Sequence, residues 1–456
     1  MSFDDQINRI KEKLIIAKEK DAGLKVFGAG RHKYVLNKPA TINDIRSFEN
    51  SYSIDLPECY KSFMTNIGNG GAGPFYGIYS LGEGLNEITS SKAKKYLGRD
   101  CIISPEISES YWLSLNKKID ENEDISNDDY EKELGRIFGG ILPIGNQGCT
   151  YYHGIILNGD HKGKVVNLDS DRQKPQFTYE ENFLDWYERW LDEIISGDLL
   201  EDGPSWFGYL MGGTDREIIE KFLMSDDETF KSGCLKSILN LKSIECETVK
   251  IIEQQLSVES EHLRIKLIEL LVKFDYEIAR PHLHTLLTDN LLCFFQFICW
   301  YAPDKSQEWL SVAEPEIDKI SDSETLRFYI LLLEKAGVDY GPKLVPFTYN
   351  VDMDTRVTAF YNLGRLKNKK DYLDHLIRGL YDESNPVVHT TLQALSGLKD
   401  WELFNHYREV ARRFTKDEHS ILTKLNSNLR VFGYDNISIL ENNENNKVEK
   451  KWYRFW

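Results

Sequence analysis

A glycine-rich stretch constrains the fold more than any other segment of this 456-residue chain. It reads NIGNGGAGPFYG, from Asn66 to Gly77. Glycine and asparagine tolerate positive φ, so this stretch should turn sharply instead of forming a regular element. The apolar spacing over residues 41–64 predicts two short helices, with Pro57 opening the second. A strand is expected next, over Phe75–Leu81, which together predicts an α+β beginning.

Two sequence patterns surround these glycines. The first has the form E-x-x-x-x-(I/L)-x-L-P-x-x-Y-x-x-F, and the second is N-G-G-A-G-P-x-Y-G. Their members are Glu49, Ile54, Leu56, Pro57, Tyr60, Phe63, Asn69, Gly70, Gly71, Ala72, Gly73, Pro74, Tyr76 and Gly77. Further blocks are Phe27–Gly30 with His32 and Tyr34, Ile141–Cys149 with Gly145 and Gly148, Gly163–Val166, and Phe183–Trp190. In combination, over roughly residues 20–195, they resemble the SUKH superfamily, also called the Smi/Knr family.

The resemblance implies a mixed sheet with flanking helices, in which the motif residues are mainly structural. It also implies a bacterial immunity protein whose partner is a cognate protein toxin of a polymorphic or contact-dependent system, often a nuclease. Such a protein neutralises the toxin by binding it, without catalysis. Fungal relatives are cell-wall regulators, which leaves an alternative open: an intracellular scaffold or regulatory interaction protein.

The overall charge bears on the partner class. The chain has 73 Asp and Glu against 56 Lys and Arg, a formal net charge of −17. This acidic balance disfavours direct binding to nucleic acid or to an anionic membrane, and it weakens a third hypothesis, a nucleic-acid enzyme. No apolar run reaches the ~18 residues that span a bilayer, so we expect a cytoplasmic protein. The sequence leaves the oligomeric state open.

The second half of the chain has a different rhythm. Pairs of apolar residues three apart recur about every thirty residues, which is typical of an α-solenoid. The anchors are Leu235, Leu267, Phe297, Phe328, Phe360, Leu392 and Leu422. Arg356–Ala359 and Pro386–His389 resemble HEAT-type repeats. We therefore expect an amphipathic helix over residues 1–20, a SUKH-like domain over 20–198, a HEAT-like solenoid over 205–435, and a polar tail with an aromatic end over 436–456.

No familiar catalytic or metal-binding pattern occurs in the sequence. Gly28–Lys33 has a lysine where a dinucleotide fingerprint needs glycine, and there is no Walker loop, H-E-x-x-H or G-x-S-x-G. Cys149 near His153 invites a cysteine-nucleophile hypothesis, but no sequence feature would activate that thiol. The seven cysteines include no C-x-x-C pair. We expect no enzyme activity, no cofactor and no metal.

Two sets of residues are candidates for protein binding. The first is the aromatic set of Phe75, Tyr76 and Tyr79, which we expect to be exposed. The second is the acidic run from Asp120 to Glu133, where Lys132 is the single base. A run of this kind is usually a solvated loop, but it would also suit the basic groove of a nuclease. The acidic candidates are Asp120, Glu121, Glu123, Asp124, Asp128 and Asp129.

Overall fold

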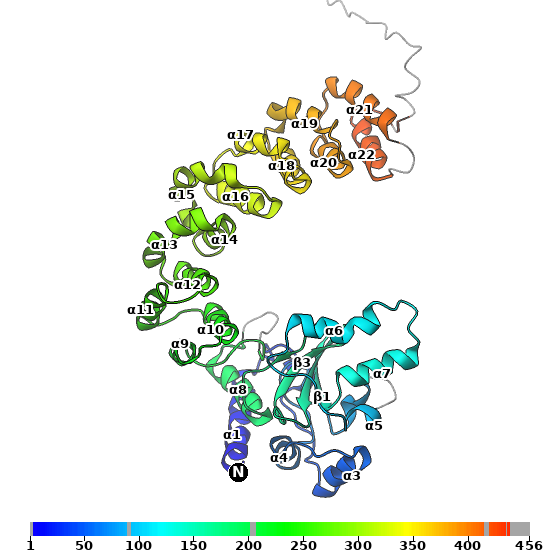
Figure 1. The fold of residues 1–456 in the computed structure, drawn as a ribbon, viewed down its shortest axis with the longest axis vertical. Helices are drawn as coiled ribbons and strands as arrows, with labels where there is room; N and C mark the ends of the chain where they lie inside the picture. Colours follow the sequence, from blue (N-terminus) through cyan, green and yellow to red (C-terminus); the bar gives the residue numbers. More distant parts are fainter. Residues whose placement is uncertain (1–2, 89–92, 201–206, 415–418, 435, 438–456) are drawn as a thin grey trace, which may run out of the picture. The chain divides into compact units, whose positions relative to one another are not determined.

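The computed structural model describes residues 3–88, 93–200, 207–414, 419–434, 436 and 437 (Figure 1). Contacts divide the chain into two compact units, Met1–Asn240 and Leu241–Trp456. Most of the predicted tail over residues 436–456 lies outside the described residues. The elements of the first unit are α1 (Asp4–Lys20), α2 (Ala29–His32), α3 (Ile42–Tyr52), α4 (Glu58–Asn66), η1 (Glu83–Asn86), α5 (Ala93–Tyr96), α6 (Glu109–Asp120), α7 (Asn127–Ile137), β1 (Ile141–Gly148), β2 (Tyr151–Ile156), β3 (Val165–Asp169), β4 (Gln176–Phe177), α8 (Phe183–Ser196), α9 (Asp215–Met224) and α10 (Glu228–Asn240).

The sheet is a four-stranded antiparallel meander in the order β1-β2-β3-β4. The expectation of a mixed sheet is therefore wrong for the strands that the structure describes. A tight turn joins β1 to β2, and Cys149, at φ 48°, lies in it; longer loops join the other strands. The expected strand over Phe75–Leu81 is also wrong, because this segment makes only isolated bridges through Ile78, to Gly71 and to Gly145.

The sheet buries both of its faces. Leu142, Ile144 and Ile155 belong to one core, which they share with α1, α4 and α8. Their neighbours along the strands, such as Ile141 and Ile156, belong to a second core with α6 and α7. Because side chains alternate along a strand, continuous apolar strands suit a sheet that is covered on both sides. The first unit is therefore layered, with helices on each face (Figure 1).

Helix α8 carries the tryptophan-rich block Phe183–Trp190. Asn182 caps it, and its apolar stripe, which includes Trp186 and Trp190, is fully buried. These tryptophans are therefore core residues. Helix α1 packs against α8, where Arg9 and Lys13 contact the Glu188 carboxylate at 2.9 and 2.8 Å. Burial opposes ionisation of Glu188, but hydrogen bonds from these cations outweigh it and lower its pKa.

The segment that follows α8 belongs to the first unit. Asn167 of β3 donates to the Gly208 carbonyl at 3.1 Å, and the Tyr209 hydroxyl donates to Gln147 of β1 at 2.7 Å. The backbone of Met211 in turn binds Ser237 of α10 at 2.8 Å. These bonds attach α9 and α10 to the sheet, although the rhythm of the sequence changes before them.

The second unit is helical throughout its described residues. Its elements are α11 (Cys246–Gln255), α12 (Glu261–Phe274), α13 (Tyr276–Asp289), α14 (Leu291–Tyr301), η2 (Pro303–Lys305), α15 (Ser306–Ala313), η3 (Glu314–Lys319), α16 (Ser323–Lys335), α17 (Gly341–Leu344), η4 (Val345–Tyr349), α18 (Met353–Arg365), η5 (Lys369–Tyr372), α19 (Leu373–Gly379), α20 (Asn385–Ala394), α21 (Glu402–Arg413) and α22 (His419–Arg430). No helix in the described parts of the chain is long and apolar enough to cross a membrane.

The predicted anchors fall on alternate helices, from α10 to α22. Within the second unit, α12, α14, α16, α18, α20 and α22 pack in succession, each on the next. Leu267, Phe297, Phe360 and Leu392 are buried at these contacts, whereas Phe328 and Leu422 are half-buried. Trp300, three residues after its anchor, is 50 % exposed. The regular helical array is confirmed, and its relation to HEAT repeats stays a prediction.

Candidate functional site

The glycine-rich stretch is packed against neighbouring backbone. Gly70, Gly71 and Gly77 have positive φ, as expected. A Cβ on Gly77 would lie 2.3 Å from the Gly71 carbonyl oxygen, and one on Gly145 would lie 2.7 Å from the Gly77 oxygen. Neighbouring chain already occupies the space that these glycines leave. The glycines therefore permit close approach of the chain to itself, which supports the structural interpretation.

The aromatic candidates do not form an exposed group. Phe75 is 8 % exposed and packs between Phe27 and His153, with ring centroids 5.8 and 5.2 Å away. The expectation that Phe75 is exposed is therefore wrong, because the turn directs its ring into the core. Tyr76 and Tyr79 are half-buried. Tyr79 donates to Glu87 at 2.9 Å, and burial together with this bond raises the pKa of its hydroxyl.

The upstream motif residues also have structural roles. Leu56, Tyr60 and Phe63 are buried, and both rings lie 5.2 Å from the ring of Phe183 on α8. Pro57 immediately precedes α4 and serves as its N-cap. Other motif residues include Asn69, Gly73, Pro74 and Gly148, of which Asn69 accepts a hydrogen bond from the backbone of Leu81.

The acidic run is not a single loop. It comprises the end of α6, a short turn and most of α7. Asp120 forms an ion pair with Arg172, which lies 52 residues away in the sequence. Glu121 lies 3.6 Å from Lys117. Several cations thus offset the run in space, although Lys132 is the single base within it.

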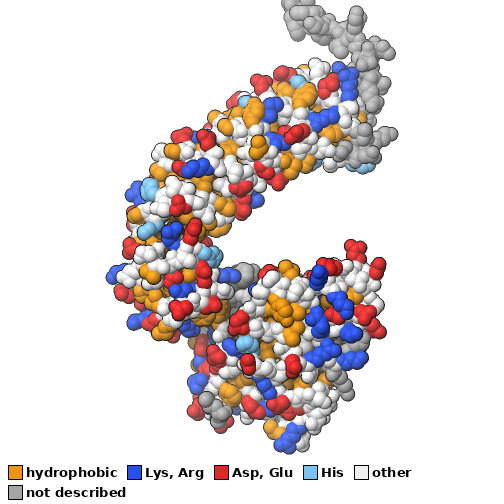
Figure 2. Space-filling view, viewed as in Figure 1, with side chains coloured by type: hydrophobic (Ala, Val, Ile, Leu, Met, Phe, Trp, Pro, Cys, Tyr) orange, Lys and Arg blue, Asp and Glu red, His pale blue; other side chains and the backbone are white. Residues whose placement is uncertain are grey.

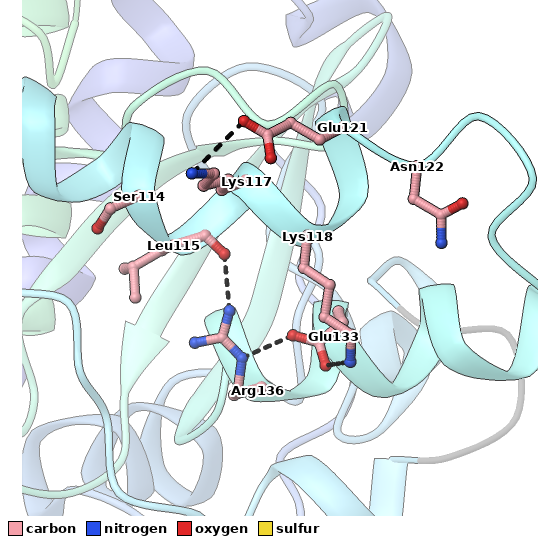
Figure 3. Close-up of a pocket in the computed structure, with 8 residues that line it drawn as sticks. All are labelled: Ser114, Leu115, Lys117, Lys118, Glu121, Asn122, Glu133 and Arg136. Carbon is pink, nitrogen blue, oxygen red and sulfur yellow. Dashed lines mark hydrogen bonds and ion pairs between the residues drawn. The ribbon is translucent and has the colours of Figure 1, made fainter.

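Glu133 is the buried member of the run. Its carboxylate accepts hydrogen bonds from Lys118 at 2.6 Å and from Arg136 at 2.7 Å, and Arg136 also donates to the Leu115 carbonyl (Figure 3). The Lys118 hydrogen bond lowers the pKa of Glu133, against the effect of burial and with the help of Arg136. These groups line an open groove of about 640 Å³ between α6 and α7. Glu133 therefore holds the two helices together and is not available to a partner.

The exposed acids lie in the turn between α6 and α7 and in the first turn of α7. Glu121, Glu123, Asp124, Asp128 and Asp129 are exposed. Asp129 also belongs to the cap of α7, since its backbone and carboxylate bind Ser126. Glu123 and Asp124 form no ion pair with any residue that the structure describes. In Figure 2, acidic and basic side chains are interspersed over this part of the first unit. We call residues 121–129 the acidic turn.

The Cys149 and His153 side chains differ in their surroundings. Cys149 is exposed in the β-turn, whereas His153 is fully buried, with Nδ1 within 3.1 Å of Gln147 and Asn167. Burial lowers the pKa of His153 to about 3. Its imidazole is committed to a hydrogen-bonded network within the core. Within the described residues, no group of His, Cys, Asp and Glu side chains could hold a metal ion.

Sequence reasoning missed the partners of the acidic run. Arg136 lies three residues after Glu133, a spacing that a helix would bring together. Lys118 and Arg172 carry no comparable signal, since they come from another helix and from the loop after β3. The packing of α1 against α8 through Glu188 could not be predicted from residue spacing either, because the two helices lie far apart in the sequence.

The start of the chain is an α+β domain. It has a small antiparallel meander with a helical layer on each face, and a glycine turn that is bridged to β1. Residues 39–189 match the family model described as the SMI1 / KNR4 family (SUKH-1). This part of the chain therefore carries a SUKH-type domain, which begins after α1 and ends within α8. No curated protein matches the chain.

Proposed function

We propose that this chain is a non-catalytic immunity protein, acting in the cytoplasm, that binds and neutralises a cognate protein toxin. The observation that supports the proposal is the SUKH-1 match over residues 39–189. A protein that acts by binding needs a complementary surface and no reacting groups. The hydrogen bonds that hold His153 in the core are consistent with such a role.

The acidic turn supports a nuclease as the toxin class. A nuclease grips phosphates, so its substrate groove is basic. Exposed carboxylates such as Glu123 and Asp124 would enter such a groove and be steered toward it over a Debye length of ~8 Å. Each exposed pair should contribute on the order of 0.2–1 kcal/mol, so the group matters more than any single member.

The test uses the product of the neighbouring gene, which the proposal expects to be the toxin. Co-expression with the present chain should restore growth of cells that carry the toxin, and the purified proteins should form a complex. The variant Glu121→Gln/Glu123→Gln/Asp124→Asn should bind several-fold more slowly in stopped flow and lose most of its salt dependence. Unchanged growth inhibition together with no complex would contradict the immunity role.

A matched control separates the acidic turn from overall charge. The variant Glu253→Gln/Asp318→Asn/Asp374→Asn removes the same number of exposed acids from other helices. It should associate like the wild type. If both variants slow equally, net charge and not the acidic turn steers the encounter.

The alternative is an intracellular scaffold or regulatory interaction protein. The helical array of the second unit favours it, because stacked repeats present extended binding surfaces. A chain that fails to protect against its neighbouring toxin, but whose second unit alone retains a stable partner, would favour this alternative.

A further inference from the structure

The N-terminal part of the chain has the opposite charge balance to the whole. Residues 18–46 contain seven Lys and Arg against three Asp and Glu, in a chain of net charge −17. We call these seven cations the basic strip: Lys18, Lys20, Lys25, Arg31, Lys33, Lys38 and Arg46. All seven are exposed. The strip follows the chain from the end of α1 to α3 (Figure 1).

The basic strip is not neutralised within the structure. None of its cations forms an ion pair with a residue that the structure describes, unlike Arg9, Lys13 and Lys61 nearby. Lys18 and Lys20 lie in the last turn of α1, where they complement the helix dipole. Arg31 ends the short helix α2 and lies over the Tyr76 ring, 5.6 Å from its centroid. The remaining four cations have no comparable contact among the described residues.

Exposed aliphatic side chains accompany these cations. Five large apolar residues in and beside the strip are exposed, at 63 %, 42 %, 36 %, 58 % and 55 %: Ile15, Ile16, Leu24, Val35 and Ile42. Leu24 lies in a loop tip at φ 52°. Scattered surface apolar residues are ordinary, but their alternation with unpaired cations over one short segment is a different pattern.

Hydrogen bonds to buried groups fix the backbone of the strip. The buried Asp21 carboxylate accepts from the backbone of Lys25 at 2.6 Å and of Val26 at 3.2 Å, and from the Tyr34 hydroxyl at 2.8 Å. Further along, Asn37 binds the Gly70 carbonyl through its backbone. The loops that carry Leu24, Lys25 and Val35 are thus tied to the core and present these side chains outward.

We propose that the basic strip is a peripheral binding surface for anionic lipid bilayers. Lysines dominate it, and lysine is depleted in protein–protein interfaces, so a protein partner fits less well. Nucleic acid would use stacked aromatic rings, and the exposed apolar side chains here are aliphatic. Cations interspersed with aliphatic side chains suit the boundary between headgroups and acyl chains.

The acidic charge of the whole chain disfavours an anionic membrane in general, but it acts only weakly at the strip. Exposed charges are screened beyond ~8 Å at physiological salt, so the local strip and not the distant carboxylates determines attraction to a surface. A cation near an anionic leaflet increases partition by about fivefold. Several together would give reversible binding that weakens as salt rises.

The experiment measures partition of the full chain onto sedimenting vesicles. The vesicles are phosphatidylcholine alone, or with about 30 mol % phosphatidylglycerol, at about 0.05 M and about 0.3 M salt. We expect binding only to the anionic vesicles, weaker at the higher salt. The variant Lys25→Gln/Lys33→Gln/Lys38→Gln should reduce partition at least tenfold. Leu24→Ser/Val35→Ser should reduce it severalfold.

The matched control is Lys221→Gln/Lys236→Gln/Lys367→Gln, which removes three exposed lysines elsewhere and gives the same net charge. It should bind like the wild type, and thermal melting should show each variant folded. The proposal is overturned if the wild type does not bind anionic vesicles at low salt, or if both lysine variants lose partition equally. It is also overturned if the strip variant loses affinity for a mixed-sequence RNA or an acidic protein while its partition onto vesicles is unchanged.

Discussion

Two glycines with similar backbone conformations separate the effect of a steric clash from that of a strained dihedral angle. Gly28 and Gly159 have φ of 83° and 75°. A Cβ on Gly28 would lie 1.9 Å from the Phe75 carbonyl oxygen, whereas one on Gly159 would meet nothing within 4 Å. The two positions therefore differ mainly in what surrounds them.

We expect Gly28→Ala to lower the free energy of unfolding by more than about 2 kcal/mol, because the strained φ and the clash act together. Gly159→Ala should lower it by about 1 kcal/mol, from the dihedral alone. Denaturant unfolding with a common m-value measures both. Equal losses would show that the loop around Phe75 can yield, and that the glycine turn is less tightly packed than the structure indicates.

Buried His153 predicts a dependence of stability on pH. Its pKa is lowered by burial to about 3, so the unfolded chain takes up a proton near pH 6.5 that the folded chain does not. This contribution is fully present above pH 6.5 and is lost as the pH falls from 6.5 toward 3. The slope is at most about 1.4 kcal/mol per pH unit for one proton. His32, whose pKa burial lowers to about 4, acts in the same direction.

His153→Gln should therefore be less stable than the wild type at pH 7 but lose stability more slowly between pH 7 and 5.5. Free energies of unfolding at several pH values give the two slopes. His32→Gln should remove a further part of the pH dependence of stability. Parallel curves for wild type and His153→Gln would mean that this imidazole binds its proton equally well in the folded and the unfolded chain.

At the scale of elements, one buried ion pair connects successive helices of the second unit. Arg356 of α18 forms two hydrogen bonds with Asp382, at 2.9 and 3.0 Å, in the turn that precedes α20. The side chains are 9 % and 7 % exposed. Arg356 also donates to the carbonyls of Asn350 and Val351, so it organises the turns on both sides of α18.

Removing Asp382 leaves the buried Arg356 guanidinium with only the exposed Glu383 carboxylate, 3.9 Å away, as a counter-charge among the described residues. Asp382→Asn should lower the free energy of unfolding by about 3–5 kcal/mol. The matched control is Glu308→Gln, which breaks the exposed pair with Arg280 and should cost at most about 1 kcal/mol. A similar small loss for both would indicate that water reaches Arg356 and replaces its partner.

At the scale of the whole molecule, the extent of the first unit is testable by truncation. A fragment of residues 1–198 would lose the hydrogen bonds from Asn167 to Gly208 and from Tyr209 to Gln147, and would uncover Trp186, which packs on Phe207. We expect a fragment of residues 1–240 to melt cooperatively and the shorter fragment to melt at least 5 °C lower, about 1 kcal/mol or more. Equal melting temperatures would place the boundary at the sequence-predicted 198–205.

Local patterns in the sequence determined much of this architecture. The glycine turn, the helix pair that Pro57 divides, the aromatic face of α8 and the alternate helices of the second unit all follow from backbone preferences and periodicity within a few residues. These features need no knowledge of distant contacts. For the same reason the SUKH signature was readable in Leu56–Phe63 and Asn69–Gly77.

The tertiary structure alone decided which of the candidate residues are available to a partner. Phe75 turned inward because the chain crosses itself at Gly28. Asp120 and Glu133 acquired partners 52 and 15 residues away, whereas Glu123 and Asp124 did not. The cations of the basic strip stayed unpaired. Burial and ion pairing depend on the closure of long loops and on packing, which short-range periodicity does not encode.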